Sequence, residues 1–167
     1  MSAAEDRREI HEAVLRYCRA VDRLDLPGVR AVYAADGTDH HTGFSGSADD
    51  FVAWLGRSLP HLDGTMHLVG NHLCELAGDQ AVAETYGTAT HWAAPYDDPR
   101  RNFTSGFRYV DHFVRTGEGW RIRERFAVRE WARSDAGRLL PATPDGPRAD
   151  RGEQDPLAVL RRRLDLG

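Results

Sequence analysis

The sequence predicts a small α+β protein in which helices cover a strongly bent, mostly antiparallel sheet. Two observations carry this prediction: apolar residues recur every three or four positions in the N-terminal part, and every second position between residues 65 and 132. Because the predicted helices precede the predicted strands along the chain, we expect a bent sheet with helices covering one face. With 41% hydrophobic residues in 167, the chain can form one domain that closes over a core and a cavity.

Two helices are predicted at the N-terminus. The first runs from Ala3 to about Leu24, with apolar residues along one face and acidic residues in its first turn. Pro27 starts a short second helix, which is expected to end near the turn-forming sequence AADG at 34–37. The two would form a helical hairpin.

A short strand and a third helix are expected next. Residues 38–46 contain enough Thr and Phe for a strand but end in glycines. Ser47 followed by Asp50 resembles a capping box and predicts a helix over 48–60, with Trp54 on its buried side.

Four longer strands complete the predicted sheet, and hairpin turns separate them. They span roughly 65–77, 80–93, 103–115 and 119–132. We therefore expect one domain over 1–133. The remaining 134–167 are rich in Pro, Gly, Asp and Arg, which indicates an arm with a short helix near 155–164.

Charge and composition argue against several classes of partner. The net charge is −4, and the 22 basic residues are spread along the chain until 161–163, so no surface suited to nucleic acid is predicted. No apolar run approaches the roughly 20 residues of a membrane span, and the N-terminus is charged where a signal peptide is apolar. We expect a cytoplasmic protein with reduced cysteines, no nucleic-acid partner and no membrane contact.

The stretch TMHLVGNH at 65–72 places two histidines inside a predicted strand. Side chains alternate between the faces of a strand, so His67 should share a face with Asn71, and His72 should lie on the other. A half-buried histidine beside an amide is suited to proton transfer, because imidazole titrates near neutral pH. Periodicity alone favours the alternative, a structural histidine with satisfied hydrogen bonds.

Asp22, near the end of the first helix, is a candidate partner for His67. A carboxylate that accepts the Nδ1–H of a histidine fixes its tautomer and stabilises the imidazolium. The helix dipole disfavours a carboxylate at this end, which hints at a role beyond solvation. Tyr17 lies on the buried face of the same helix, either as a hydrogen-bond donor to a substrate or as a core residue.

Other polar residues are weaker candidates. Strict alternation in the last strand places Arg125 on the solvent face, and only a bulge would turn it inward. His40 and His41 are adjacent and point to opposite faces, so the pair predicts no metal site. His91 is consistent with either a pocket edge or the surface.

Three motifs taken together resemble a known family. They are Y-x4-D in RYCRAVD, T-x-H-x-x-x-N in TMHLVGN, and the ending GWRIRERFAVREW. In this order they are similar to SnoaL-like proteins of the nuclear transport factor 2-like superfamily over residues 4–133. The most similar branch holds scytalone dehydratase, bile acid 7α-dehydratase and hexachlorocyclohexane dehydrochlorinase. The resemblance implies a cone-shaped barrel in which a curved, mixed or antiparallel sheet and three N-terminal helices enclose an apolar pocket.

The resemblance also implies roles for individual residues. His67 corresponds to the catalytic base and Asp22 to its orienting partner. Tyr17 stands where the dehydratases have a tyrosine and the dehydrochlorinase a lysine, which favours an oxygen leaving group. Arg125 corresponds to an arginine that lines the pocket in that branch, and this match favours the bulged register in the last strand. The residues expected to bind the substrate are Arg125, Asn71, His91, Trp54 and Tyr86.

The sequence therefore predicts a cofactor-independent lyase, a dehydratase with a His–Asp pair that acts on a hydrophobic ring substrate such as a steroid or polyketide. No metal or other cofactor is expected. An isomerase or cyclase would use the same proton transfer without loss of water. A ligand carrier, or an accessory subunit like the small chain of ring-hydroxylating dioxygenases, would use the fold without catalysis. A homo-oligomer, either a trimer or a dimer, is expected.

Overall fold

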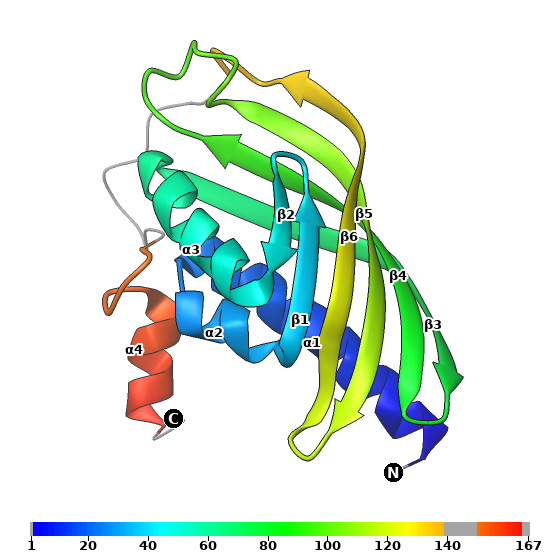
Figure 1. Cartoon of the computed structure of the whole chain (residues 1–167). Coiled ribbons are helices and arrows are strands. Elements are labelled where there is room, and N and C mark those ends of the chain that lie inside the picture. The colour runs from blue at the N-terminus through cyan, green and yellow to red at the C-terminus, as the bar shows by residue number, and fades with distance from the viewer. Residues whose placement is uncertain (1, 139–149, 165–167) are drawn as a thin grey trace.

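A curved sheet of six strands forms the body of the protein, with strand order β2-β1-β6-β5-β4-β3 (Figure 1). The computed structural model describes residues 2–138 and 150–164. The strands are antiparallel except for the parallel pair β1 and β6, so the predicted α+β class with a mixed sheet is confirmed. The elements are α1 (Ala3–Arg23), α2 (Leu26–Ala31), β1 (Tyr33–His41), β2 (Phe44–Ser47), α3 (Ala48–Ser58), η1 (Leu59–His61), β3 (Gly64–Ala77), β4 (Gln80–Trp92), β5 (Phe103–Thr116), β6 (Gly119–Ser134) and α4 (Pro156–Arg163).

Helix α1 packs along the sheet and reaches both β3 and β6. The Ser2 side chain and Glu5 form a capping box at its start, which supplies partners for helix-terminal N–H groups. Its buried side carries Ile10, Val14 and Tyr17, none more than 1% exposed. Each aliphatic side chain buried in this way contributes about 1.5–3 kcal/mol. This packing fixes the end of α1 against the first residues of β3.

The segment between α2 and α3 differs from the prediction. The sequence at 34–37, expected to form a turn, belongs to β1, and the single strand expected over 38–46 is a β1–β2 hairpin that turns at Gly43. Gly43 has a φ of +85°, which glycine adopts without steric cost. Residues 34–37 nevertheless have no partner on β6: they lie in the register shift between Tyr33 and Thr38, so the expected turn is present as a bulge within β1.

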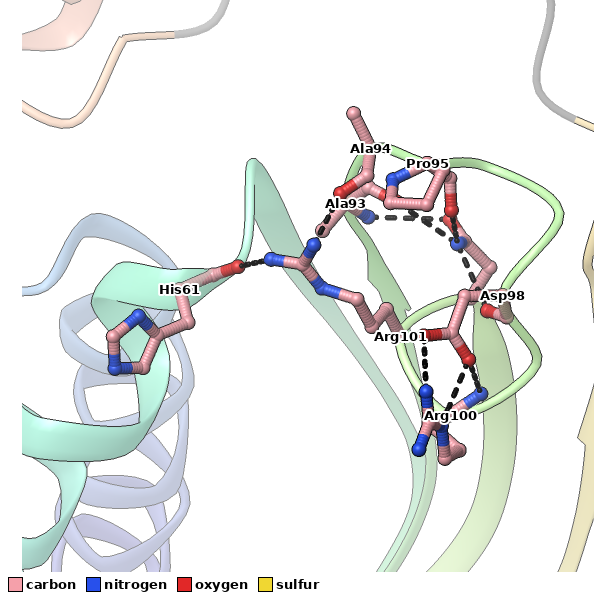
Figure 2. A network of polar contacts seen from close by, with 8 residues as sticks. His61, Ala93, Ala94, Pro95, Asp98, Arg100 and Arg101 are labelled. Carbon is pink, nitrogen blue, oxygen red and sulfur yellow. Dashed lines mark hydrogen bonds and ion pairs between the residues drawn. The ribbon is translucent and has the colours of Figure 1, made fainter.

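The long loop between β4 and β5 is tied to η1 at one end of the sheet (Figure 2). The Arg101 guanidinium donates to the carbonyl oxygens of Ala94 and His61. Asn102, 1% exposed, donates to the Ala93 carbonyl and accepts from the Ala93 N–H. These bonds satisfy buried backbone groups and hold the loop in a defined position.

The chain after β6 returns to the C-terminal end of α1. Arg23 pairs with Asp155 at 3.3 Å, and Arg151 donates to the Leu62 carbonyl at 2.8 Å. Helix α4 lies where a helix was predicted over 155–164, whereas residues 139–149 and 165–167 of the predicted arm lie outside the described residues. Within residues 2–138 and 150–164, no helix is long and apolar enough to span a membrane.

Candidate active site

Asp22 and His67 are in direct contact. The His67 Nδ1 lies 2.6 Å from Asp22 Oδ1, and the His67 backbone N–H donates to Oδ2 at 2.9 Å. Thr65 donates its hydroxyl to Oδ1 at 3.1 Å. The carboxylate thus receives three hydrogen bonds, while the side chains of His67 and Asp22 are only 8% and 14% exposed.

The geometry follows from the two elements that carry the pair. Asp22 lies in the last turn of α1, and His67 lies near the start of β3, the edge strand of the sheet. An outward backbone N–H of an edge strand has no neighbouring strand to accept its hydrogen bond. Here the Asp22 carboxylate accepts the bond from the His67 N–H. Because the carboxylate accepts Nδ1–H, the Nε2 of His67 is left as the basic nitrogen.

His91 and Phe107 flank the His67 ring. Their ring centroids lie 6.3 and 6.0 Å from that of His67. His91 stacks on Phe103 at 4.4 Å, and its Nδ1 is buried with no partner among the described residues. Burial, assisted by His67, lowers the pKa of His91 from 6.5 to about 4, so this ring is neutral beside the pair.

A groove of about 480 Å³ runs along the seam between α1 and β3 and reaches the pair. Its walls are mostly apolar or half-buried side chains, and they include Leu15, Cys18, Val69 and Trp92 besides Asp22 and His67. A groove of this size falls in the range of small-molecule sites.

Tyr17 and Arg125 lie together in the core. The Arg125 guanidinium is 4.2 Å above the Tyr17 ring and 4.0 Å from that of Tyr109, and it forms a bidentate pair with Asp111 at 2.7 and 2.6 Å. A bulge that leaves Arg123 unpaired between Ile122 and Glu124 turns Arg125 inward. The bulged register is therefore confirmed, and alternation alone was the wrong guide at this position.

A second bulge corrects the expected faces of Asn71 and His72. Between the Val69–Gly87 and His72–Thr85 pairs, β3 has two residues opposite one on β4. The extra residue reverses the alternation, so Asn71 is exposed and His72 points inward, where its Nδ1 contacts the Thr85 hydroxyl at 2.8 Å. The prediction that Asn71 lies beside His67 on the inner face is wrong.

The two aromatic candidates differ in position. Trp54 is half-buried and packs on Phe44 and Phe51, on the inner side of α3. Tyr86 is 45% exposed and lies on the outer face of the sheet, where Arg108 contacts its ring. Tyr86 is therefore outside the interior that Trp54 and His67 face.

Sequence reasoning did not select several residues of this region. Thr65 stands two positions before His67, and strand alternation would have placed it on the same face. Asp111 pairs with Arg125 through the β5–β6 register, which no local pattern reveals. Asp39, which is fully buried, contacts the Nδ1 of His41 on the same strand.

A curved six-stranded sheet with helices packed along it is the fold of nuclear transport factor 2-like proteins. The chain belongs to the SnoaL-like domain family, which matches residues 2–126. An uncharacterized protein of Mycobacterium tuberculosis is 29% identical over 134 residues, which cover 77% of this chain and 90% of that protein.

Solved structures share the fold at low identity. A Kribbella flavida protein superposes with a TM-score of 0.72 at 23% identity, covering 79% of this chain and 95% of that one. A scytalone dehydratase candidate from Novosphingobium aromaticivorans gives 0.68 at 17%, covering 86% and 94%. A hexachlorocyclohexane dehydrochlorinase gives 0.67 at 14%, covering 85% and 99%.

Proposed function

We propose that the protein is a cofactor-independent lyase that removes water from a hydrophobic ring substrate, such as a steroid or polyketide. The contact between His67 Nδ1 and Asp22 Oδ1, at 2.6 Å in a largely buried setting, is the observation that carries this proposal. Two of the similar structures bear the names of elimination enzymes, a scytalone dehydratase candidate and a dehydrochlorinase. At these identities they support the fold directly and the reaction class only as a proposal.

In this mechanism His67 Nε2 removes a proton from a substrate carbon. Asp22 holds the ring in the required tautomer and stabilises the imidazolium that forms. The neutral His91 and the Phe107 ring flank the base on the side of the sheet. General-base catalysis of this kind contributes about 10²–10⁴-fold.

The oxygen end of the substrate would lie toward Tyr17 and Arg125. Burial raises the pKa of Tyr17 well above its ordinary value, and the nearby Asp39 adds to the effect, so the phenol stays protonated. A protonated phenol and a guanidinium both donate hydrogen bonds, which suits a carbonyl or hydroxyl oxygen. Trp54 and His91 would contact the ring faces of the substrate.

The proposed reaction can be tested with β-hydroxylated tetralones and hydroxysteroid ketones, with products identified by mass. The wild-type protein should yield a product lighter by one water. His67→Gln should lower this rate at least ~10²-fold. His112→Gln is a matched control, because His112 contacts Gln80 at the exposed, distant end of β5. A product of unchanged mass would instead identify an isomerase or cyclase, and equal rates in His67→Gln would refute the proposal.

We further propose that the protein forms a homo-oligomer through the outer face of the sheet. Large apolar side chains on β3, β4 and β6 are strongly exposed there: Leu73 73%, Val82 52%, Tyr86 45% and Phe126 44%. Several large apolar side chains exposed on one face of a sheet favour a subunit contact there.

A further inference from the structure

A cleft of about 370 Å³ lies between the C-terminal end of α1 and the segment that leads into α4 (Figure 1). Arginines line it from both sides: Arg19 and Arg23 on α1, and Arg151 and Arg161 on the C-terminal segment. Guanidinium groups that converge from two elements favour an anionic ligand, provided that the carboxylates of the protein do not already neutralise them.

The carboxylates of the cleft serve mainly to hold its walls. The side chains of Asp25 and Asp155 cap helices α2 and α4, and Glu153 pairs with Arg162. Among residues 2–138 and 150–164, no carboxylate forms an ion pair with Arg19 or Arg151. The cleft therefore has more cationic donors than its own acidic residues engage.

Two of these arginines have nitrogens without an acceptor. Arg151 donates through Nη1 to the carbonyl oxygens of Leu62 and Leu59, at 2.8 and 3.5 Å, whereas its buried Nη2 has no partner among the described residues. The Nε of Arg23 is also buried, and it lies 3.3 Å from Asp155 Oδ2 without the alignment of a hydrogen bond. Buried donors that lack an acceptor destabilise a protein, so both nitrogens indicate an acceptor that a ligand supplies.

The charges around Arg151 support the same reading. Burial lowers the pKa of Arg151, an effect that Asp22 and Asp63 oppose and that the charge of Arg23 reinforces. The two guanidinium groups are thus close enough to repel each other. An anion bound by both would offset the repulsion as well as the cost of burial.

The cleft adjoins the groove of the candidate active site, because Arg19 and Arg23 line both hollows. On the groove side, the walls include the exposed apolar side chains of Leu15, Met66 and Leu68. Exposed apolar side chains next to guanidinium groups suit a ligand with an apolar body and an acidic end.

We propose that the cleft binds the carboxylate of an apolar organic acid, with Arg23 and Arg151 as its donors and Arg19 at its rim, while the apolar body of the acid lies in the groove between α1 and β3. Residues 150–164 then complete a binding site that the α+β body alone does not form. This inference goes beyond the proposed lyase function, because it concerns binding and holds for any reaction at His67.

The ligand class can be tested by NMR titration of the intact protein with octanoate, 1-octanol, acetate and octyl phosphate. Octanoate should bind at least ~10-fold more tightly than 1-octanol or acetate, because it alone uses both the arginines and the groove. Added salt should weaken the binding of octanoate and leave that of 1-octanol unchanged. Equal affinities for octanoate and 1-octanol, or for octanoate and acetate, would overturn the inference. Tighter binding of octyl phosphate by ~10-fold or more would overturn the choice of a carboxylate.

Replacement of one arginine tests the donors. Arg151→Gln should lower the affinity for octanoate at least ~10-fold and leave the affinity for 1-octanol unchanged. Arg8→Gln is the matched control, because it removes the same charge near the other end of α1, where Arg8 is exposed and pairs with Glu12. An octanoate affinity in Arg151→Gln equal to that of Arg8→Gln would contradict the assignment.

A measurement on the wild-type protein decides the matter if Arg151→Gln does not fold. The side-chain Nε–H signals of Arg23 and Arg151 should shift on addition of octanoate and stay in place with 1-octanol. Octanoate binding that moves neither signal would overturn the inference. A protein that binds octanoate through these arginines but removes water from no substrate would lose the lyase proposal alone.

Discussion

His91 should make the protein less stable as the pH falls, and its replacement should remove that dependence. Burial lowers the pKa of His91 from 6.5 to about 4. Between these two values the unfolded chain binds the proton and the folded protein does not, so unfolding becomes easier as pH decreases. Protonation of the unfolded chain therefore lowers the free energy of unfolding by about 3 kcal/mol near pH ~4 and has no effect above pH ~7.

The comparison variant is His91→Phe, which retains a ring against Phe103 and carries no proton. Urea unfolding of both proteins, at several pH values between ~7 and ~4, gives the difference in their free energies of unfolding. That difference should move by about 3 kcal/mol in favour of the variant as the pH falls. His91→Leu should behave in the same way. A difference that stays constant over this range would refute the reasoning.

Three further predictions concern the carboxylates and the outer surface. Asp22→Asn replaces a carboxylate oxygen with an amide N–H2, which donates a hydrogen bond where the carboxylate accepts one from His67 Nδ1. ¹⁵N NMR should therefore show a loss of the Nδ1–H tautomer, and an unchanged tautomer would refute the assignment. Asp111→Asn leaves Arg125 short of its buried partner and should lower the free energy of unfolding by about 3–5 kcal/mol in urea titrations; a loss below about 1 kcal/mol would contradict the burial argument. Leu73→Lys on the outer face should reduce the mass measured by light scattering to that of a smaller species, whereas an unchanged mass would exclude this face as the subunit contact.

The helices and the four long strands could be predicted because their periods are regular and their ends carry recognisable signals. Asp22 and His67 were found for a related reason: both lie in regular stretches, before any bulge shifts the alternation. Their contact depends on how α1 lies along the edge strand, and only the motif order suggested it.

The remaining errors have a common physical cause, a register shift that no local pattern records. One extra residue near Gly70 exchanged the faces of Asn71 and His72, and one extra residue at Arg123 turned Arg125 inward. The segment at 34–37 lies within β1 as a bulge, because the pairing with β6 shifts register between Tyr33 and Thr38. Asp39 and His41 share a face by simple alternation, yet their burial depends on that same pairing.

Proton exchange at carbon tests the central claim, that the His67–Asp22 pair is a base for C–H acids. The measurement is the rate at which the acidic protons of α-tetralone exchange in D2O, followed by NMR, with the intact protein and its variants. The wild-type protein should accelerate exchange, and both His67→Gln and Asp22→Asn should reduce the acceleration at least ~10²-fold. Exchange that proceeds at the wild-type rate in His67→Gln would contradict the claim.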